Sequence, residues 1–330
     1  MRIGKKNVFF ILLFIVSLGL VYLIISTFSF ISLQFKFFYE LSEQSDIVEA
    51  KVIYTITNDE KIIYLNKKDN LVTIEQIEPS NVKPIILFSF EIKNEEMQTY
   101  SFEKRGNLHY LFYNNNKSLI IIDVKNSEFK IYNDLNFDFF LINENNNSYY
   151  YYTDYVIYSF SENKPIYHIS NNILNIKSIN FISNDYLFIQ TYNESNYILN
   201  LTNMEYSLID NYILYASINN NTLYYTYYFS NNDLIITTFK DNEFTSFKIK
   251  RVDFQSFIVK DEYMYLILDN SIQKVSLKRK KANEVLNISG YTDYIYDLNN
   301  IIIYNEKTMY LPMIYKETNR YKYRLYRYKV

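Results

Sequence analysis

The feature of this sequence that most constrains its fold is a unit of about 40 residues that recurs after residue 50. Each unit holds four short runs rich in Ile, Tyr, Phe, Val and Thr, separated by clusters of Asn, Asp, Ser and Lys. The fifth unit shows this order as DNYILYASIN, NTLYYTYYF, NDLIITTFK and EFTSFKIK. The most aromatic run of each unit is, in order, KIIYL, LHYLF, YYYYT, YLFIQ, LYYTY, YMYLI and IIIY. No amphipathic helix of convincing length interrupts the series, so this region is predicted to be all-β.

Four strands per unit and a period of about 40 residues predict the blades of a β-propeller. Residues 51–330 have room for about seven such units, so the predicted fold is all-β, a seven-bladed β-propeller. Six or eight blades stay open, because the 47-residue spacing between Asp59 and Gly106 has room for another strand. A β-solenoid or two stacked β-sandwiches would also space strands regularly, although solenoid coils are typically shorter, about 20–30 residues.

Aromatic side chains are expected to fill the space between the blades. The chain has 37 Tyr and 25 Phe but only four Gly. A four-stranded sheet cannot bury both of its faces alone, so neighbouring blades must pack face to face, and large rings suit that packing. Asn is expected to replace Gly in the tight turns, because Asn tolerates the left-handed backbone region. Most Tyr and Phe residues are therefore interpreted as packing groups.

The N-terminus has the pattern of a membrane anchor. Arg2, Lys5 and Lys6 precede a largely apolar run at 8–28, and the next charge is Lys36. As a helix this run spans about 31 Å, the thickness of a bilayer core. The predicted organisation is a cytoplasmic N-terminus at 1–7, a transmembrane helix at 8–33, a stalk at 34–50 and the β-propeller at 51–330, which the positive-inside rule places outside the cytoplasm. The alternative is a cleaved signal peptide, which would make the protein secreted.

One repeat carries a resemblance to known propellers. The segment Tyr151-Tyr152-Thr153-Asp154, followed by YVIYSF, resembles one YWTD repeat with Tyr in place of Trp. The order of an aromatic strand, a polar turn and an Ile- or Tyr-rich strand is also similar to the TolB-like and other β-propellers of bacterial cell-envelope proteins. The resemblance is to the superfamily and to no specific family. It implies an extracytoplasmic binding or scaffolding role and assigns no functional residue.

The sequence offers little chemistry. It has no Cys, no phosphate-binding loop and no His-Glu-x-x-His motif, so no catalytic, cofactor-binding or metal-binding residue is predicted. His109 and His168 lie in apolar strand contexts and are interpreted as partly buried packing residues. Asp154, Asp185 and Asp261 fall in turns, where Asp is expected. A pair of carboxylates across the propeller channel would instead serve a carbohydrate-active hydrolase or lyase, which is the alternative function.

Two basic stretches form a candidate interaction surface. The first stretch, at 278–281, is interpreted as a solvated turn or as a contact with an anionic partner. The second stretch, at 320–329, is interpreted as an outermost strand whose charges prevent edge pairing, or as a contact with an anionic partner. The residues are Lys278, Arg279, Lys280 and Lys281, and Arg320, Lys322, Arg324, Arg327 and Lys329.

The net charge of −2 does not indicate a nucleic-acid partner. The predicted function is a membrane-anchored extracytoplasmic binding or scaffold module for a protein or a glycan. A structural subunit of an envelope complex is a third class, which a large exposed aromatic patch would favour.

Overall fold

The structure of the protein is a computed structural model. It describes residues 35–44, 54–57, 59–78, 83–93, 95–97, 100–105, 108–113, 115, 117–146, 148–209, 211–230, 233–288 and 294–330. The described chain forms two compact parts, a larger one within residues 52–291 and a smaller one that joins residues up to 51 with residues 292–330. Every sheet in both parts is antiparallel.

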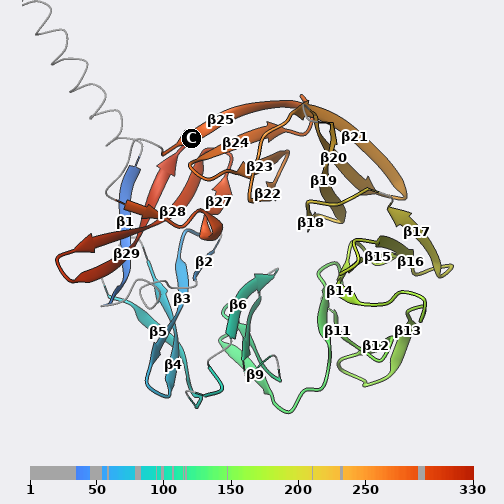
Figure 1. Cartoon of the computed structure of the whole chain (residues 1–330). Helices are drawn as coiled ribbons and strands as arrows, with labels where there is room; N and C mark the ends of the chain where they lie inside the picture. The colour runs from blue at the N-terminus through green and yellow to red at the C-terminus, as the bar shows by residue number, and fades with distance from the viewer. Residues whose placement is uncertain are drawn as a thin grey trace, which may run out of the picture. The chain divides into compact units, whose positions relative to one another are not determined.

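The larger part contains six four-stranded sheets, which we call blades 1 to 6, and each is built from four consecutive strands of the chain. In Figure 1 the fourth strands β9, β13, β17 and β21 lie on the outside of this part, and the first strands lie on the inside. Blade 1 is β2 (Tyr54–Ile56), β3 (Ile62–Lys68), β4 (Leu71–Ile77) and β5 (Ile85–Glu91), and blade 2 is β6 (Tyr100–Arg105), β7 (Leu108–Tyr113), β8 (Ser118–Asp123) and β9 (Glu128–Tyr132). Blade 3 is β10 (Phe139–Asn143), β11 (Ser148–Thr153), β12 (Val156–Ser159) and β13 (Pro165–His168), and blade 4 is β14 (Ile176–Phe181), β15 (Tyr186–Thr191), β16 (Asn196–Asn200) and β17 (Glu205–Ile209). Blade 5 is β18 (Tyr215–Asn219), β19 (Thr222–Ser230), β20 (Asp233–Lys240) and β21 (Glu243–Lys250), and blade 6 is β22 (Ser256–Lys260), β23 (Tyr263–Ile267), β24 (Ser271–Ser276) and β25 (Lys281–Asn287).

The smaller part is the seventh blade, and it contains both ends of the described chain. Its sheet has the order β1 (Phe35–Gln44), β29 (Arg320–Lys329), β28 (Thr308–Glu317) and β26 (Tyr294–Tyr296), and β27 (Ile302–Asn305) also pairs with β28. The short 3-10 helix η1 (Leu298–Asn300) separates β26 from β27. Pro312 of β28 lies opposite this break, where its missing N–H removes no ladder bond, and its carbonyl accepts the backbone N–H of Asp297 at 3.1 Å.

The described sheets therefore confirm an all-β, seven-bladed β-propeller, and the six-bladed, eight-bladed and solenoid alternatives are wrong. Burial explains why the second strand of each unit has the most continuous apolar run. The second and third strands are covered on both faces by the neighbouring blades, as in β7 and β8, whereas the outer strand β9 is largely exposed. Apolar clusters join neighbouring blades throughout the larger part, such as Leu65 and Val72 of blade 1 with Leu111 of blade 2.

The turns use Asn and Asp as predicted. Most of the non-glycine residues with positive φ in the described chain are Asn or Asp. The pairs Asn220-Asn221 and Asp241-Asn242 each join two strands of blade 5 with positive φ at both positions. This is the backbone of a two-residue type I′ hairpin, which matches the twist of the strands it connects.

Blade 7 differs from the prediction in three ways. Residues 34–50 are predicted as a stalk, but residues 35–44 form β1 and pair with β29. The C-terminal run is predicted as an outermost strand, but β29 lies between β28 and β1. The run IIIY at 301–304 is predicted to be equivalent to the second strands, yet β27 occupies the first-strand position. All three differences arise because the seventh blade takes its outer strand from before residue 51.

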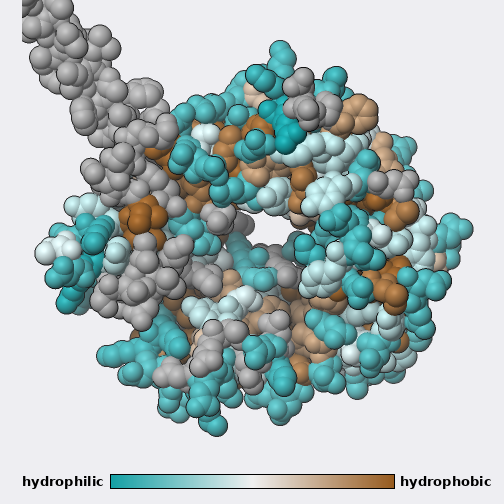
Figure 2. Space-filling view, viewed as in Figure 1, coloured by the Kyte–Doolittle hydropathy of each residue, from teal (hydrophilic) through white to brown (hydrophobic). Residues whose placement is uncertain are grey.

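The predicted transmembrane helix at 8–33 lies outside the described residues. Among the residues that the structure describes, no helix is long and apolar enough to cross a membrane. Figure 2 shows mainly hydrophilic side chains on the visible face, with apolar groups in separate patches.

Candidate functional site

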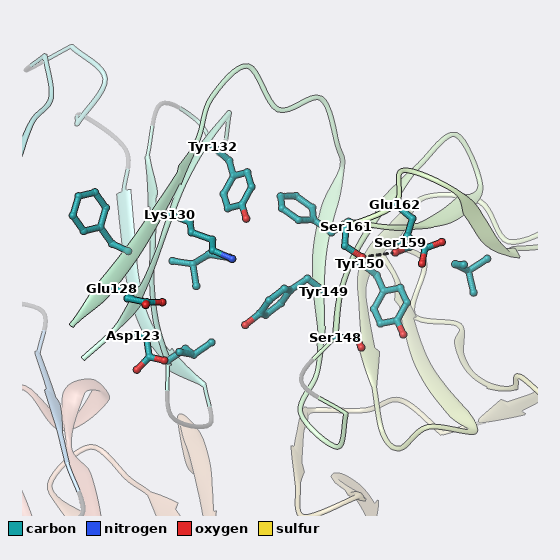
Figure 3. Close-up of a pocket in the computed structure, with 15 residues that line it drawn as sticks. Asp123, Glu128, Lys130, Tyr132, Ser148, Tyr149, Tyr150, Ser159, Ser161 and Glu162 are labelled. Carbon is teal, nitrogen blue, oxygen red and sulfur yellow. Dashed lines mark hydrogen bonds between the residues drawn. The ribbon is translucent and has the colours of Figure 1, made fainter. Parts of the chain in front are cut away.

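A cleft of about 830 Å³ lies between blades 2 and 3 of the larger part. Figure 3 shows its two walls, with β8 and β9 on one side and strands β11 to β13 on the other. The wall of blade 2 contributes Asp123, Glu128, Lys130 and Tyr132, and the wall of blade 3 contributes Ser148, Tyr149, Ser159, Phe160, Ser161 and Glu162. A hollow of this size is within the range of ligand-binding pockets.

Strand alternation decides which side chains reach the cleft. In β9 the residues Glu128, Lys130 and Tyr132 share one face, which lines the cleft. Phe129 also borders the cleft, but its ring contacts Phe88 of blade 1 with ring centroids 5.5 Å apart. The cleft therefore receives the polar face of β9, and the apolar face packs against blade 1.

The same alternation divides the tyrosines of β11. Tyr149 points toward blade 2, whereas Tyr150 points away from it in Figure 3. The ring of Tyr150 packs against Phe181 of blade 4, with ring centroids 5.0 Å apart. Only the first of these two rings is directed across the cleft toward blade 2.

The floor of the cleft is aromatic. Tyr132 and Phe160 make an edge-to-face contact across it, with ring centroids 4.8 Å apart. Tyr149 packs on Phe140, and its hydroxyl accepts a hydrogen bond from the Tyr110 hydroxyl at 3.4 Å. These contacts hold the rings in place, so the aromatic surface is organised before any ligand arrives.

The polar groups at the rim are hydroxyls and charges of both signs. The Oγ atoms of Ser159 and Ser161 lie 3.2 Å apart, as the dashed line in Figure 3 marks. Glu162 makes an exposed ion pair with Lys164 at 3.2 Å, and Asp123 accepts hydrogen bonds from Asn126. Among the described residues that line the cleft, the ionisable groups are Asp123, Glu128, Lys130, Glu162 and the tyrosines. The arrangement is suited to binding.

Sequence reasoning missed the cleft. Its residues belong to strands that the repeat predicts correctly, but the repeat does not say which inter-blade face stays unfilled. The one available signal is β9, EFKIY, which alternates charged or polar residues with apolar ones more strictly than other outer strands. Such alternation predicts that one face is packed and the other is open to solvent.

His109 and His168 have different environments. His109 is 2% exposed, and its Nε2 lies 2.9 Å from the Thr55 hydroxyl, which confirms the interpretation as a packed residue. Burial, and secondarily the charge of Lys104, lowers the pKa of His109 to about 4. His168 is exposed, so the interpretation as a partly buried residue is wrong for it. It lies on β13, the outer strand of blade 3, where no further strand covers it.

The predicted turn carboxylates occupy turns. Asp154 and Asp261 have positive φ at hairpin turns, and the backbone N–H of Asp185 bonds the Ser183 hydroxyl at 3.2 Å. Asp154 also lines a hollow of about 400 Å³ together with Asp138 and Tyr152. Burial, assisted by the charges around it, raises the pKa of Tyr152 to about 12, so this hydroxyl stays protonated.

The two basic stretches belong to different compact parts of the chain. Lys278, Arg279, Lys280 and Lys281 are all exposed, at and after the turn between β24 and β25 of blade 6. The C-terminal group Arg320, Lys322, Arg324, Arg327 and Lys329 lies on β29 of blade 7.

Acidic residues pair with most of the second group. Arg324 Nε lies 2.8 Å from Glu40 Oε2, and Arg320 Nη1 lies 3.0 Å from Glu43 Oε1, both glutamates being on β1. Lys322 also contacts Glu43, at 3.9 Å. These charges are used to attach β1 to β29.

Among the described residues, no three His, Asp or Glu side chains are grouped as a metal site requires. No protein-family profile matches the sequence, and no curated protein is similar to it in sequence. Solved structures do match the fold. An uncharacterized protein of Listeria monocytogenes matches with a TM-score of 0.54 and 11% identity, over 87% of this chain and 93% of its own.

Two lyase structures are similar in the same way. An oligogalacturonate lyase of Vibrio parahaemolyticus has a TM-score of 0.61 and 9% identity, over 88% of this chain and 96% of its own. An oligogalacturonate lyase in complex with manganese has a TM-score of 0.61 and 8% identity, over 90% of this chain and 96% of its own. At these identities the similarity shows the β-propeller fold and assigns no activity.

Proposed function

We propose that this chain is a binding or scaffold module, held at a cell membrane by residues 8–33 with its β-propeller outside the cytoplasm, and that its ligand is a protein or a glycan. The cleft between blades 2 and 3 is the observation that carries the proposal. It combines organised aromatic rings with hydroxyls and charges of both signs. Tyrosine-rich surfaces of this kind are common at recognition sites, because each ring offers apolar area and a polar end.

The position of the cleft also supports a ligand that is long. Its walls include the outer strands β9 and β13 together with residues of β8, β11 and β12, so the cleft extends to the outer side of the larger part. An extended peptide or a glycan chain can enter such a cleft from the side. Glu128 and Lys130 are exposed on its wall and are free to adjust to the ligand.

Photo-crosslinking in the cells that produce the protein tests the cleft. The probe is p-benzoylphenylalanine, placed at Lys130 in the full chain, and the control carries it at Lys248, an exposed position on the outer strand β21. We expect a discrete crosslinked species at position 130 that is absent at position 248. Combining Glu128→Lys with the probe at position 130 should reduce the yield of this crosslinked species. No species at position 130, or the same species at both positions, would overturn binding in the cleft.

The membrane part of the proposal has its own test. A reporter fused after Val330 should be active only outside the cytoplasm. Activity confined to the cytoplasm would contradict the proposed orientation, and release of the reporter into the medium would show the cleaved, secreted form.

A carbohydrate-active hydrolase or lyase is the second candidate function. It is favoured by the hollow that Asp138 and Asp154 line together, since glycoside hydrolysis uses a pair of carboxylates. Two of the structurally similar proteins are oligogalacturonate lyases, so oligogalacturonate is the first substrate to test. Cleavage by the wild-type chain that is lost in both Asp138→Asn and Asp154→Asn would establish this function. An absence of turnover would leave binding.

The exposed residues Lys278, Arg279, Lys280 and Lys281 form a second proposed contact, with an anionic lipid headgroup, a wall polymer or an acidic protein. The paired residues of β29 contribute less to such a contact, because Glu40 and Glu43 already compensate part of their charge.

A further inference from the structure

A second hollow, of about 480 Å³, lies beside the inner strands of blades 3, 4 and 5. Seven carboxamide side chains line it, which is about half of its lining residues, and they come from β10, β14, β15, β18 and the adjoining turns. Those that the argument uses are Asn143, Asn180, Gln190 and Asn219. We call this hollow the amide pocket.

A small side chain leaves space for the amide pocket. Ala216 of β18 packs with the apolar cluster that joins blades 4 and 5, and it lines the pocket. The neighbouring members of that cluster, such as Phe188 and Ile218, are large. Since most inter-blade positions of this chain carry Ile, Leu or an aromatic ring, a methyl group at this position leaves space that its neighbours do not fill.

Two of the amides build the walls. Asn143 and Asn219 are the last residues of β10 and β18, so they occupy equivalent positions in blades 3 and 5. The Asn143 amide donates to Asn184 Oδ1 at 3.0 Å, and the Asn219 amide donates to the Val259 carbonyl at 2.9 Å. Each bond links a blade to the next one, so these two side chains fix the frame and are not free for a ligand.

Two other amides remain available. Gln190 accepts one hydrogen bond from the Ser178 hydroxyl at 3.1 Å, which leaves its NH₂ group to donate. Asn180 is half-buried, and within the described part of the chain its side chain makes no hydrogen bond. A half-buried amide of this kind has both a donor and an acceptor to offer. Asn180 is not among the buried side chains that lack a partner, so water satisfies these groups in the free protein, and a ligand that displaces the water takes over its hydrogen bonds.

The chemistry of the lining selects the ligand. A carboxamide donates and accepts at the same time, and so does a hydroxyl group, which makes the two complementary. Phe188 and Ile182 belong to the buried apolar cluster beneath the pocket and are each 2% exposed, so the carboxamides make the contacts with a ligand. Among the described residues, no Lys or Arg lines the pocket, and the carboxylate of Glu144 there would repel an anion. We infer that the amide pocket binds a unit of an uncharged glycan, and not a uronate.

This site is separate from the cleft between blades 2 and 3, with which it shares no lining residue. The amide pocket therefore extends the proposed function to a second place on the chain and names the ligand there. A failure of one site leaves the other unaffected.

Binding by the full chain in lipid nanodiscs tests the inference. The probes are cellohexaose, maltohexaose, mannohexaose and chitohexaose, with hexagalacturonate as the charged comparison, and the readout is isothermal titration calorimetry. Nanodiscs avoid sugar-based detergents, which would compete. We expect at least one neutral hexasaccharide to bind, and hexagalacturonate to bind at least tenfold more weakly.

Three variants locate the binding. Asn180→Asp keeps the shape of the side chain but removes the donor and adds a charge, and it should weaken binding at least tenfold. Asn193→Asp makes the same change at an exposed turn of blade 4 and should have no effect. Ala216→Phe should fill the pocket and abolish binding. If this larger substitution prevents folding, Asn180→Asp decides alone, with circular dichroism verifying that it is folded.

Three results would overturn the inference. The first is that no neutral hexasaccharide binds. The second is that hexagalacturonate binds more tightly than the neutral probes. The third is that Asn180→Asp binds the neutral hexasaccharide as tightly as the wild type does. Neutral binding that is lost with Tyr132→Ala of the cleft and kept in Asn180→Asp would refute the amide pocket and would support the proposed function of the cleft.

Discussion

Replacing His109 by glutamine should remove a pH-dependent part of the free energy of unfolding. The ring of His109 is 2% exposed, stacks on Phe102 with centroids 5.6 Å apart, and contacts the Thr55 hydroxyl through Nε2 at 2.9 Å. Its Nδ1 has no hydrogen-bond partner in the described part of the chain. Burial is the main cause that lowers its pKa from 6.5 to about 4, and the nearby charge of Lys104 adds to it.

The magnitude follows from linkage. A pKa that is lower in the folded state means that the unfolded chain binds more protons between about pH 6.5 and about pH 4. The free energy of unfolding therefore falls as the pH is lowered through this window. The contribution is fully present above pH 6.5 and is lost by about pH 4. A pKa difference of about 2.5 corresponds to about 3.5 kcal/mol in full, at about 1.4 kcal/mol per unit, and about 3 kcal/mol of it is lost between pH 7 and pH 4.

Urea unfolding of the wild type, His109→Gln and His168→Gln between pH 7 and pH 4 tests this pH dependence. Since carboxylates also titrate in this range, the quantity to compare is the pH dependence of each variant against that of the wild type. His109→Gln can still bond Thr55 but does not titrate, so its free energy of unfolding should fall by about 3 kcal/mol less than that of the wild type. His168→Gln is the matched control, because His168 is exposed, and it should follow the wild type. Equal pH dependence in the wild type and His109→Gln would refute the reasoning.

Three further changes test the packing. Tyr323→Phe removes the hydrogen bond that the buried Tyr323 hydroxyl donates to Asp297 Oδ2 at 3.0 Å. It should lower the free energy of unfolding by about 1.5–3 kcal/mol in urea titrations, and a change under about 0.5 kcal/mol would contradict a hydrogen bond to a charged group. Glu40→Lys places a like charge beside Arg324 on the β1–β29 pair. It should lower the free energy of unfolding by about 1 kcal/mol at low salt and by less in 0.5 M NaCl. A loss of stability that does not depend on salt would argue against the ion pair. Leu266→Ala empties a fully buried position of β23 and should cost about 2–5 kcal/mol by the same assay, and a near-neutral result would mean that blade 6 is not packed as described.

Local features of the sequence are enough to place most strands and turns. The fifth unit is predicted as DNYILYASIN, NTLYYTYYF, NDLIITTFK and EFTSFKIK, and the structure has β18 to β21 at these four segments. The hairpin at Asn220-Asn221 likewise adopts the left-handed backbone that its residue types favour. These features follow from side chains and backbone angles within a few residues, and the repetition of the unit then favours seven blades while leaving six or eight open.

Blade 7 could not be assembled from the sequence alone. The strand at residues 35–44 pairs with residues 321–328, and a local pattern carries no information about a partner almost 300 positions away. The basic residues of β29 indicate a charged strand, but they do not identify Glu40 and Glu43 as its partners. The sequence also leaves open whether such a strand is an edge, since that depends on what the rest of the chain adds to it.

The candidate sites depend on the tertiary structure in the same way. The sequence by itself determined most strands and turns and the repetition of a unit of about 40 residues, because those depend on neighbours along the chain. Only the packing of one blade against the next decided that Lys130 and Tyr149 line a cleft and that Ala216 leaves space beside Asn180. A cleft or a pocket is space that two sheets leave unfilled, so it depends on the facing side chains of both sheets, which are distant in the sequence.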